Sequence, residues 1–329
     1  MLVLERETFP REKVCGDCLN PACWPILRRL GIADTIRTLP HGVLNAVEFI
    51  GVNGPRISVP LPRDEDAEIA VKRSFFDHAL MQRARECGAD VRQAVTVMGA
   101  QWLSDLWQIT TGDEEFRARV LVAADGRNSS VARFCGLLPR IEKERVAIQT
   151  HLPLPHGFGD RVVLEFRPEG YSGQAPIGED QLNLCLVSTA AKLAGIRRWA
   201  EARFGISPWQ SWRTITPLRR DPIYSVTPNL FLVGDAARVV EPLTGEGIYY
   251  AIASGELAAS FIRLALRRDD TIAAGVEYQK AHARLYRGRL WVNRLARQAV
   301  LHPRIASGAL ELCRARPGLL RFLTRKIVR

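Results

Sequence analysis

An apolar segment, FLV at residues 231–233, runs directly into Gly234 and Asp235. A carboxylate at the carboxyl end of a buried strand lies where α/β folds bind ligands, so Asp235 can accept hydrogen bonds from a ribose or another polyol. A plain strand–loop–helix crossover with a capping Asp is the simpler explanation of the Gly-Asp pair alone. The residues that follow favour the binding interpretation.

The loop after Asp235 contains Pro242, Gly245 and Gly247, which let the backbone pass close to a flat ligand. A long helix with small residues on one face begins beside Gly245 and Ile248. Its free amides and positive dipole end would face the ligand and stabilise negative charge on it. This stretch therefore predicts a site for a flat ligand that carries a polyol.

Two further strand ends carry polar residues of the same kind. The segment VLVAADG ends at Asp125 and Gly126, and Ser129 or Ser130 can cap the helix that follows. The N-terminal segment MLVL ends at Glu5, and an acid at this place in a nucleotide-binding fold holds ribose hydroxyls. The alternatives are a simple turn with an N-cap for the first segment and a Glu without a binding role for the second.

Three of the seven cysteines, Cys15, Cys18 and Cys23, gather near the N-terminus in the pattern C-x2-C-x4-C. A zinc site would need a second pair of ligands downstream, and the other four cysteines are isolated. A thioredoxin-like dithiol would need the motif at the start of a helix that follows a strand, whereas this segment is a charged loop. We interpret Cys15 as a thiol that lines an active site, and we assign no metal ligand.

Apolar strands that alternate with helical segments position these residues. MLVLE, RVLVAADG and NLFLVGDAA predict buried parallel strands, which indicate an α/β fold. Residues 6–22 are predicted to be loop, and residues 43–62 a hairpin. Helical spacing predicts helices over 21–31, 73–87, about 190–204 and from 247 onward. We predict a nucleotide-type domain over 1–42, 71–144 and 217–279, a β-rich substrate domain over 43–70 and 145–216, and a basic helical segment over 280–329.

The three strand ends resemble those of the FAD-dependent family that includes para-hydroxybenzoate-type aromatic hydroxylases and geranylgeranyl reductases, over roughly residues 1–270. The resemblance implies a hydroxylase-like FAD-binding fold with an inserted β-rich substrate domain and a helical C-terminal tail. It also implies cofactor contacts: the ribose of adenosine at Glu5 with Arg6 beside it, the phosphates at Arg73, the pyrophosphate near Asp125 and Gly126, the ribityl chain at Gly234 and Asp235, and the flavin ring at Gly245, Gly247 and Ile248.

The pattern R-x-K-x-C-G-D-x-L-x-P resembles a loop of the geranylgeranyl reductase branch, which implies that Cys15 and Gly16 lie beside flavin and substrate. Cys18 stands where that branch usually has Gly. Cys15, Pro242 and Gly245 would line the face of the flavin at which the substrate reacts. No acid–base residue is assigned. In GYSGQAPIG, Gly173 and Ala175 stand where the branch often has bulky aromatics, so we expect a substrate cavity of different shape.

FAD would carry out the chemistry, with NAD(P)H or another donor as reductant and a lipophilic substrate of polyketide, quinone or isoprenoid type. The resemblance favours an NAD(P)H-linked monooxygenase, with a flavin-dependent alkene reductase of the geranylgeranyl reductase type as the alternative. The W-x-W-x-I-P signature of flavin halogenases does not occur in the sequence, so halogenation is not expected.

The sequence lacks the G-x-G-x-x-G loop with which this family begins. We expect a misassigned start, with about 30 more residues upstream to supply a first strand, its loop and a helix. If the chain is complete as written, FAD affinity should be very poor, and a non-catalytic remnant is the alternative. Purification with and without an upstream extension tests this expectation.

The net charge of +11 comes from the end of the chain. Residues 280–329 hold 13 Lys and Arg against one acid, Glu311, whereas the preceding residues are almost balanced. The simpler interpretation of this basic segment is that it forms helices with a solvated cationic face. The more specific interpretation is that it docks to a membrane surface or to an acidic carrier protein. No stacking aromatics accompany the charge, so nucleic acid is not expected as a partner. With neither a signal peptide nor an apolar span, we expect a cytoplasmic protein, peripheral to the membrane if the tail docks there.

Overall fold

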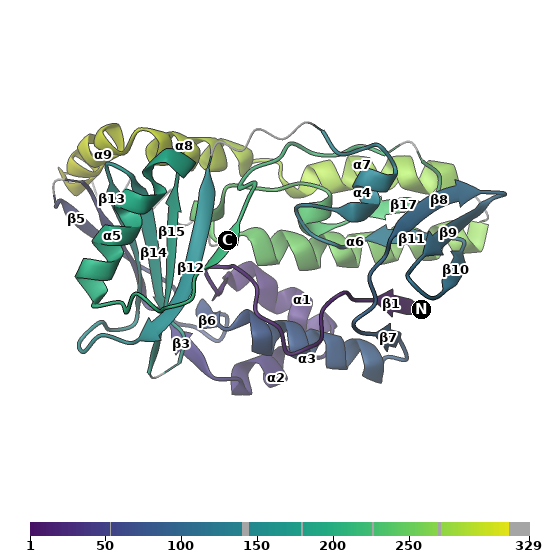
Figure 1. The fold of residues 1–329 in the computed structure, drawn as a ribbon, viewed down its shortest axis with the longest axis horizontal. Helices are drawn as coiled ribbons and strands as arrows, with labels where there is room; N and C mark the ends of the chain where they lie inside the picture. The colour runs from purple at the N-terminus through teal and green to yellow at the C-terminus, as the bar shows by residue number, and fades with distance from the viewer. Residues whose placement is uncertain (53, 140–144, 179, 226, 269–270, 316–329) are drawn as a thin grey trace.

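The computed structural model describes residues 1–52, 54–139, 145–178, 180–225, 227–268 and 271–315. Figure 1 shows two lobes: a large sheet stands at one end of the molecule, and long helices with small sheets occupy the other. The helices are α1 (Trp24–Arg29), α2 (Ala33–Thr38), α3 (Arg73–Glu86), α4 (Ser130–Phe134), α5 (Leu193–Phe204), α6 (Gly247–Arg268), α7 (Thr271–Leu285), α8 (Leu290–Leu301) and α9 (Pro303–Ala315).

The large sheet has seven strands in the order β16-β12-β15-β14-β13-β4-β5. Only the β13–β4 pair is parallel among these neighbours. The strands are β4 (Ala46–Ile50), β5 (Arg56–Pro60), β12 (Val146–Pro153), β13 (Arg161–Arg167), β14 (Gly170–Pro176), β15 (Gln181–Ser188) and β16 (Arg213–Ile215). The hairpin predicted over 43–62 is confirmed as β4 and β5. All seven strands come from the ranges predicted for the β-rich domain, whose boundaries stay a prediction.

Two short parallel pairs carry the predicted strand ends. They are β1 (Leu2–Leu4) with β7 (Asp90–Arg92), and β11 (Leu121–Ala123) with β17 (Leu230–Leu232). The helices packed over the second pair cover Phe231, which contacts Ala258 and Tyr278, but they leave Val122 42% exposed. The prediction of a buried strand is therefore right for β17 and wrong for β11, and it is also wrong for β1, where Leu2 is 38% exposed.

The remaining strands form two small sheets. One is antiparallel, with β8 (Gly99–Leu103), β9 (Leu106–Thr110) and β10 (Glu115–Ala118); the other joins β2 (Cys18–Leu19), β6 (Ile69–Val71) and β3 (His41–Val43). The prediction that 6–22 is entirely loop is wrong at β2. Cys18 and Leu19 are extended because they pair with β6 about 50 residues further along the chain, a pairing that local sequence does not encode.

Helices α3 and α6 confirm the predicted helical spacing. Phe76 and Met81 face the core on α3, and small residues such as Ala258 let α6 lie close to α7. The helix predicted over 21–31 is shorter than expected, because a 3-10 turn at Pro21–Cys23 precedes α1. In the part of the chain that the structure describes, none of the helices is both long and apolar enough to cross a bilayer.

Candidate functional site

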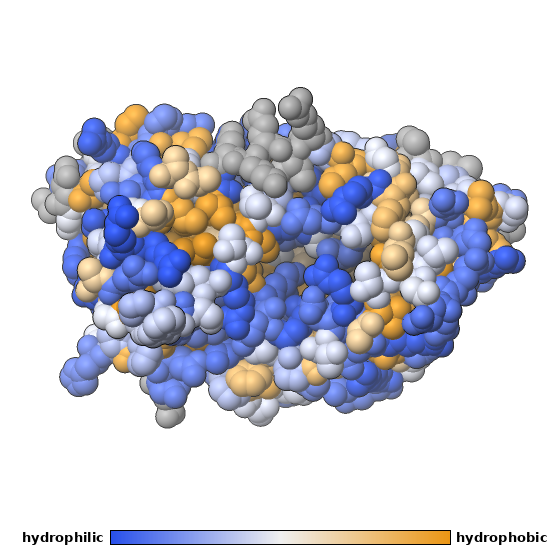
Figure 2. Space-filling model, viewed as in Figure 1, coloured by the Kyte–Doolittle hydropathy of each residue, from blue (hydrophilic) through white to orange (hydrophobic). Residues whose placement is uncertain are grey.

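A cavity of about 730 Å³ lies between the large sheet and the helical lobe. Figure 2 shows a hollow near the centre of one face, with a hydrophilic rim and hydrophobic residues gathered on the side of the large sheet. The residues of α8 and α9 that face the sheet also contribute to the wall. The predicted site residues in the wall are Cys15, Arg73, Gly126, Gly234, Asp235, Pro242, Gly245, Gly247 and Ile248.

The turn after β17 places Asp235 at the cavity. Gly234 has a φ of +54°, and a Cβ atom there would lie 3.2 Å from the Cβ of Ala251, so this position suits glycine. The Gly234 amide donates to Oγ of Ser254 at 2.8 Å, which ties the turn to α6. The Asp235 carboxylate accepts a hydrogen bond from Nη2 of Arg127 at 3.1 Å and stays partly exposed. It retains acceptor capacity for a hydroxyl group of a ligand.

Two buried carboxylates hold the ends of the loop from Pro242 to Gly247. Glu241 accepts two hydrogen bonds from Arg145, at 3.0 and 2.6 Å. Glu246 accepts hydrogen bonds from Arg289 and Asn293, both at 3.0 Å. Charge-assisted and bidentate hydrogen bonds of this kind fix geometry strongly. These contacts hold both ends of the loop in place.

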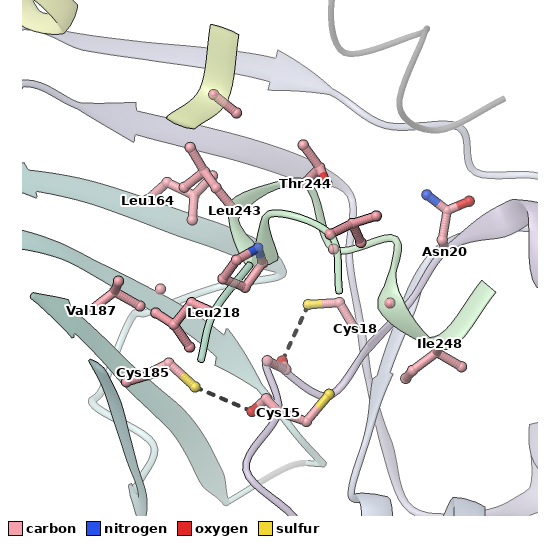
Figure 3. A pocket seen from close by; sticks show the side chains of 18 of the residues that line it. Cys15, Cys18, Asn20, Leu164, Cys185, Val187, Leu218, Leu243, Thr244 and Ile248 are labelled. Carbon is pink, nitrogen blue, oxygen red and sulfur yellow. Dashed lines mark hydrogen bonds between the residues drawn. The ribbon is translucent and has the colours of Figure 1, made fainter. Parts of the chain in front are cut away.

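The Cys15 loop is fixed to the opposite wall by β15. The amide of Asn183 donates to the carbonyl oxygen of Cys15 at 2.8 Å and to Oδ2 of Asp17 at 2.7 Å. The Cys185 thiol also donates to the Cys15 carbonyl, at 3.2 Å, and Figure 3 shows this contact beside that of Cys18 with the Gly16 carbonyl. Burial raises the pKa of Asp17, although His151 lies 3.1 Å from its carboxylate.

The three cysteines of the N-terminal pattern do not converge on one site. Cys15 and Cys18 line the cavity, whereas Cys23 lies in the hydrophobic core beside Trp24. Burial raises the pKa of the Cys18 thiol well above its usual range, and the same holds for Cys185. Among the described residues there is no group of three or more His, Cys, Asp or Glu that could hold a metal ion.

One end of the cavity is cationic. Arg73 donates to both carboxylate oxygens of Asp77, at 2.8 and 2.9 Å, and Arg11 donates to the same carboxylate at 3.0 Å. Lys13 lines the wall nearby, and repulsion from Arg73, together with burial, lowers the pKa of its ammonium group. Positive charges that repel one another here would be stabilised by an anionic ligand such as a phosphate.

Three predicted contacts lie away from the cavity wall. Asp125 accepts a hydrogen bond from the Val131 amide at 3.0 Å and so caps the start of α4 together with Ser129. Glu5 accepts a hydrogen bond from the Glu7 amide at 2.9 Å, and Arg6 forms an exposed ion pair with Glu7. The capping interpretation thus explains Asp125 in this structure, while the cofactor contacts of these three residues stay predictions.

Glu68 is a site residue that the sequence did not reveal. The residue is 9% exposed and lines the cavity, and its side chain has no hydrogen-bond donor or cation as a partner among the described residues. Burial alone raises the pKa of this carboxyl from 4.5 to about 7. In the sequence, Glu68 is one of several acids in the segment DEDAE, and only the structure shows that it is buried while others are exposed. A neutral carboxyl in an apolar cavity can donate a proton.

The wall residues fit FAD in shape and in donor chemistry. A Cβ atom added at Gly16, Gly126, Gly245 or Gly247 would meet no atom within 4 Å, so the backbone at these lining positions faces open space that a flat ring can approach. Nε of Arg127, a residue of the cavity wall, is buried without an acceptor among the described residues. The cationic end suits the pyrophosphate, and Asp235 suits the ribityl chain.

Comparisons with known proteins agree with this fit. The family of the FAD binding domain matches residues 1–154. Conditioned medium factor receptor 1 of Dictyostelium discoideum is 30% identical over 78% of this chain and 57% of its own length. Menaquinone reductase of Mycolicibacterium smegmatis is 29% identical, over 80% of this chain and 70% of that protein. Digeranylgeranylglycerophospholipid reductase of Methanosphaerula palustris is 31% identical, over 69% of this chain and 62% of that protein. The chain thus spans little more than half of the Dictyostelium relative.

Solved structures share the fold. A geranylgeranyl bacteriochlorophyll reductase-like protein from Thermoplasma acidophilum has a TM-score of 0.77 at 23% identity, covering 91% of this chain and 81% of that one. A probable FAD-dependent monooxygenase from Pseudomonas aeruginosa has a TM-score of 0.76 at 20% identity, covering 94% of this chain and 92% of that one. At these identities the likeness establishes the architecture of the chain.

Proposed function

Because the chain belongs to the superfamily of FAD-dependent oxidoreductases that contains aromatic hydroxylases and geranylgeranyl reductases, we propose that it reduces an alkene in a lipophilic substrate of isoprenoid or prenylated quinone type. The sequence alone favoured hydroxylation. We place reduction before hydroxylation because the relatives near 30% identity include two reductases. The likeness to a monooxygenase is one of fold. NAD(P)H as the electron donor is part of the proposal.

The observation that carries the proposal is the position of Cys15 and Glu68 in the wall of one apolar cavity. When bound, FAD supplies the hydride for such a reduction. The chain must then orient the alkene, exclude water and provide a proton. Leu164, Phe166 and Val187 of the large sheet supply an apolar wall, and the neutral carboxyl of Glu68 is a proton source. Cys15 would hold the substrate against the cofactor loop.

The product decides between reduction and oxygenation. We would incubate the protein with FAD, NADPH and a prenylated quinone or geranylgeranyl diphosphate, once without oxygen and once under labelled dioxygen. Reduction adds two hydrogens in both atmospheres. A product that contains one labelled oxygen, formed only under dioxygen, would overturn the proposal.

Hydroxylation is a second candidate, because the probable monooxygenase structure matches 94% of this chain. In that case NADPH oxidation would require oxygen and would accelerate with the hydroxylated substrate. A Glu68→Gln variant separates the two reactions further. Loss of the proton source should slow alkene reduction strongly, and it should leave oxygen-dependent NADPH oxidation nearly unchanged.

A further inference from the structure

Helices α8 and α9 carry apolar residues on two faces. The inner face packs on the large sheet and its core through Val292, Val300 and Leu310. Three large apolar side chains of these helices are exposed: Trp291 is 43% exposed, Leu295 48% and Ile305 72%. Figure 1 shows both helices along one outer side of the large sheet, at the upper left.

The same surface is cationic. Arg294 and Arg304 are exposed beside these apolar residues, and Arg284 and Arg287 are exposed just before α8. None of these four arginines has an acid within ion-pair distance in the described part of the chain. Apolar side chains that include a Trp, set among unpaired arginines, are the composition of a helix that lies in a membrane interface.

The cavity reaches this surface. Leu295 of α8 and Ile305 of α9 line the cavity and are also exposed, so these two side chains lie at an edge of the cavity. A lipophilic molecule that leaves a bilayer at this point would pass from one apolar environment to another without crossing water. An acidic protein partner would pair with the arginines, but it would give the exposed apolar residues at this edge of the cavity no role.

We propose that Trp291, Arg294, Leu295, Arg304 and Ile305, here called the α8–α9 face, dock on an anionic lipid bilayer and open the cavity to it. The docking stands on the exposed residues alone, and the delivery of substrate from the bilayer rests on the proposed function. Each arginine near an anionic surface strengthens partitioning about fivefold.

Vesicle sedimentation of the full chain tests the docking. The expected result is binding to vesicles of phosphatidylcholine with phosphatidylglycerol and much weaker binding to phosphatidylcholine alone. A variant with Trp291→Ser, Arg294→Gln and Arg304→Gln should lose about 25-fold or more in partitioning, since two arginines and an interfacial Trp are removed. The matched control, Trp209→Ser with Arg63→Gln and Arg119→Gln, removes the same residue types from exposed positions elsewhere and should bind like wild type.

Three results would overturn the proposal: no binding to anionic vesicles, equal loss in the control variant, or a variant-sensitive interaction with acyl carrier protein in place of vesicles. A second experiment distinguishes a failure of the docking proposal from a failure of the proposed function. The docking variant leaves the cavity wall intact, so turnover of a detergent-dispersed substrate should be unchanged, while turnover of a vesicle-embedded one should fall. Vesicle binding without any turnover would support the docking and refute the reductase proposal.

Discussion

Replacing Glu68 with glutamine should stabilise the fold in a strongly pH-dependent way. The folded chain holds the Glu68 carboxyl at a pKa of about 7, against 4.5 as its ordinary value, because the cavity wall removes it from water. The two values differ by about 2.5, and at about 1.36 kcal/mol per pKa unit this corresponds to about 3 kcal/mol. A carboxyl pKa raised by folding means that stability is complete below pH 4.5 and falls as pH rises toward 7.

The assay is urea unfolding followed by tryptophan fluorescence at several values between pH 4 and pH 8. The free energy of unfolding of Glu68→Gln minus that of wild type should increase by about 3 kcal/mol across this window and stay level above it. Glu65→Gln, at an 83% exposed side chain, is the control and should give a difference near zero throughout. A Glu68→Gln difference that does not change with pH would refute the argument that Glu68 is buried as a neutral acid.

Two other substitutions test the framework of the site. Glu241→Gln removes the buried charge that accepts two hydrogen bonds from Arg145, so we expect a loss of about 3 to 5 kcal/mol in urea unfolding. The exposed pair of Arg219 and Asp221 offers the control Asp221→Asn, with a loss below about 1 kcal/mol. Gly42→Ala places a Cβ atom 1.9 Å from the carbonyl oxygen of Pro176, so we expect the thermal midpoint to fall with a loss of about 1 to 3 kcal/mol, whereas Gly112→Ala meets no atom within 4 Å and should be nearly neutral. If a test variant lost no more stability than its control variant, the result would contradict the packing described for that position.

The parts of the site that follow local rules could be predicted from the sequence. Gly234 and Asp235 end a short apolar strand, and Gly245 and Gly247 open the next helix, so strand-end and helix-start signals place them at one cavity. Asp125 carries the same kind of signal, yet its carboxylate caps α4, because a strand-end acid can serve a helix as well as a ligand.

Residues whose role depends on long-range packing could not be predicted. Glu68 becomes a neutral acid only when the cavity wall closes around it, and Asn183 reaches the Cys15 loop across 168 residues of chain. The short pairing at Cys18 likewise depends on β6. These features depend on tertiary contacts, so neither the periodicity of the sequence nor the residue types predict them.

Titration with FAD tests the central claim, that the wall around Asp235 binds this cofactor, most directly. The protein should be expressed from its own gene with any residues that the gene encodes before Met1, and flavin fluorescence and absorption followed as FAD is added. We predict quenched fluorescence and a perturbed flavin spectrum, with affinity at least tenfold weaker in Asp235→Ala, since a charged hydrogen bond of about 1.5 to 3 kcal/mol is lost, and unchanged in Asp221→Ala. A flavin spectrum that does not respond to the protein, or one that responds equally in Asp235→Ala, would contradict the account.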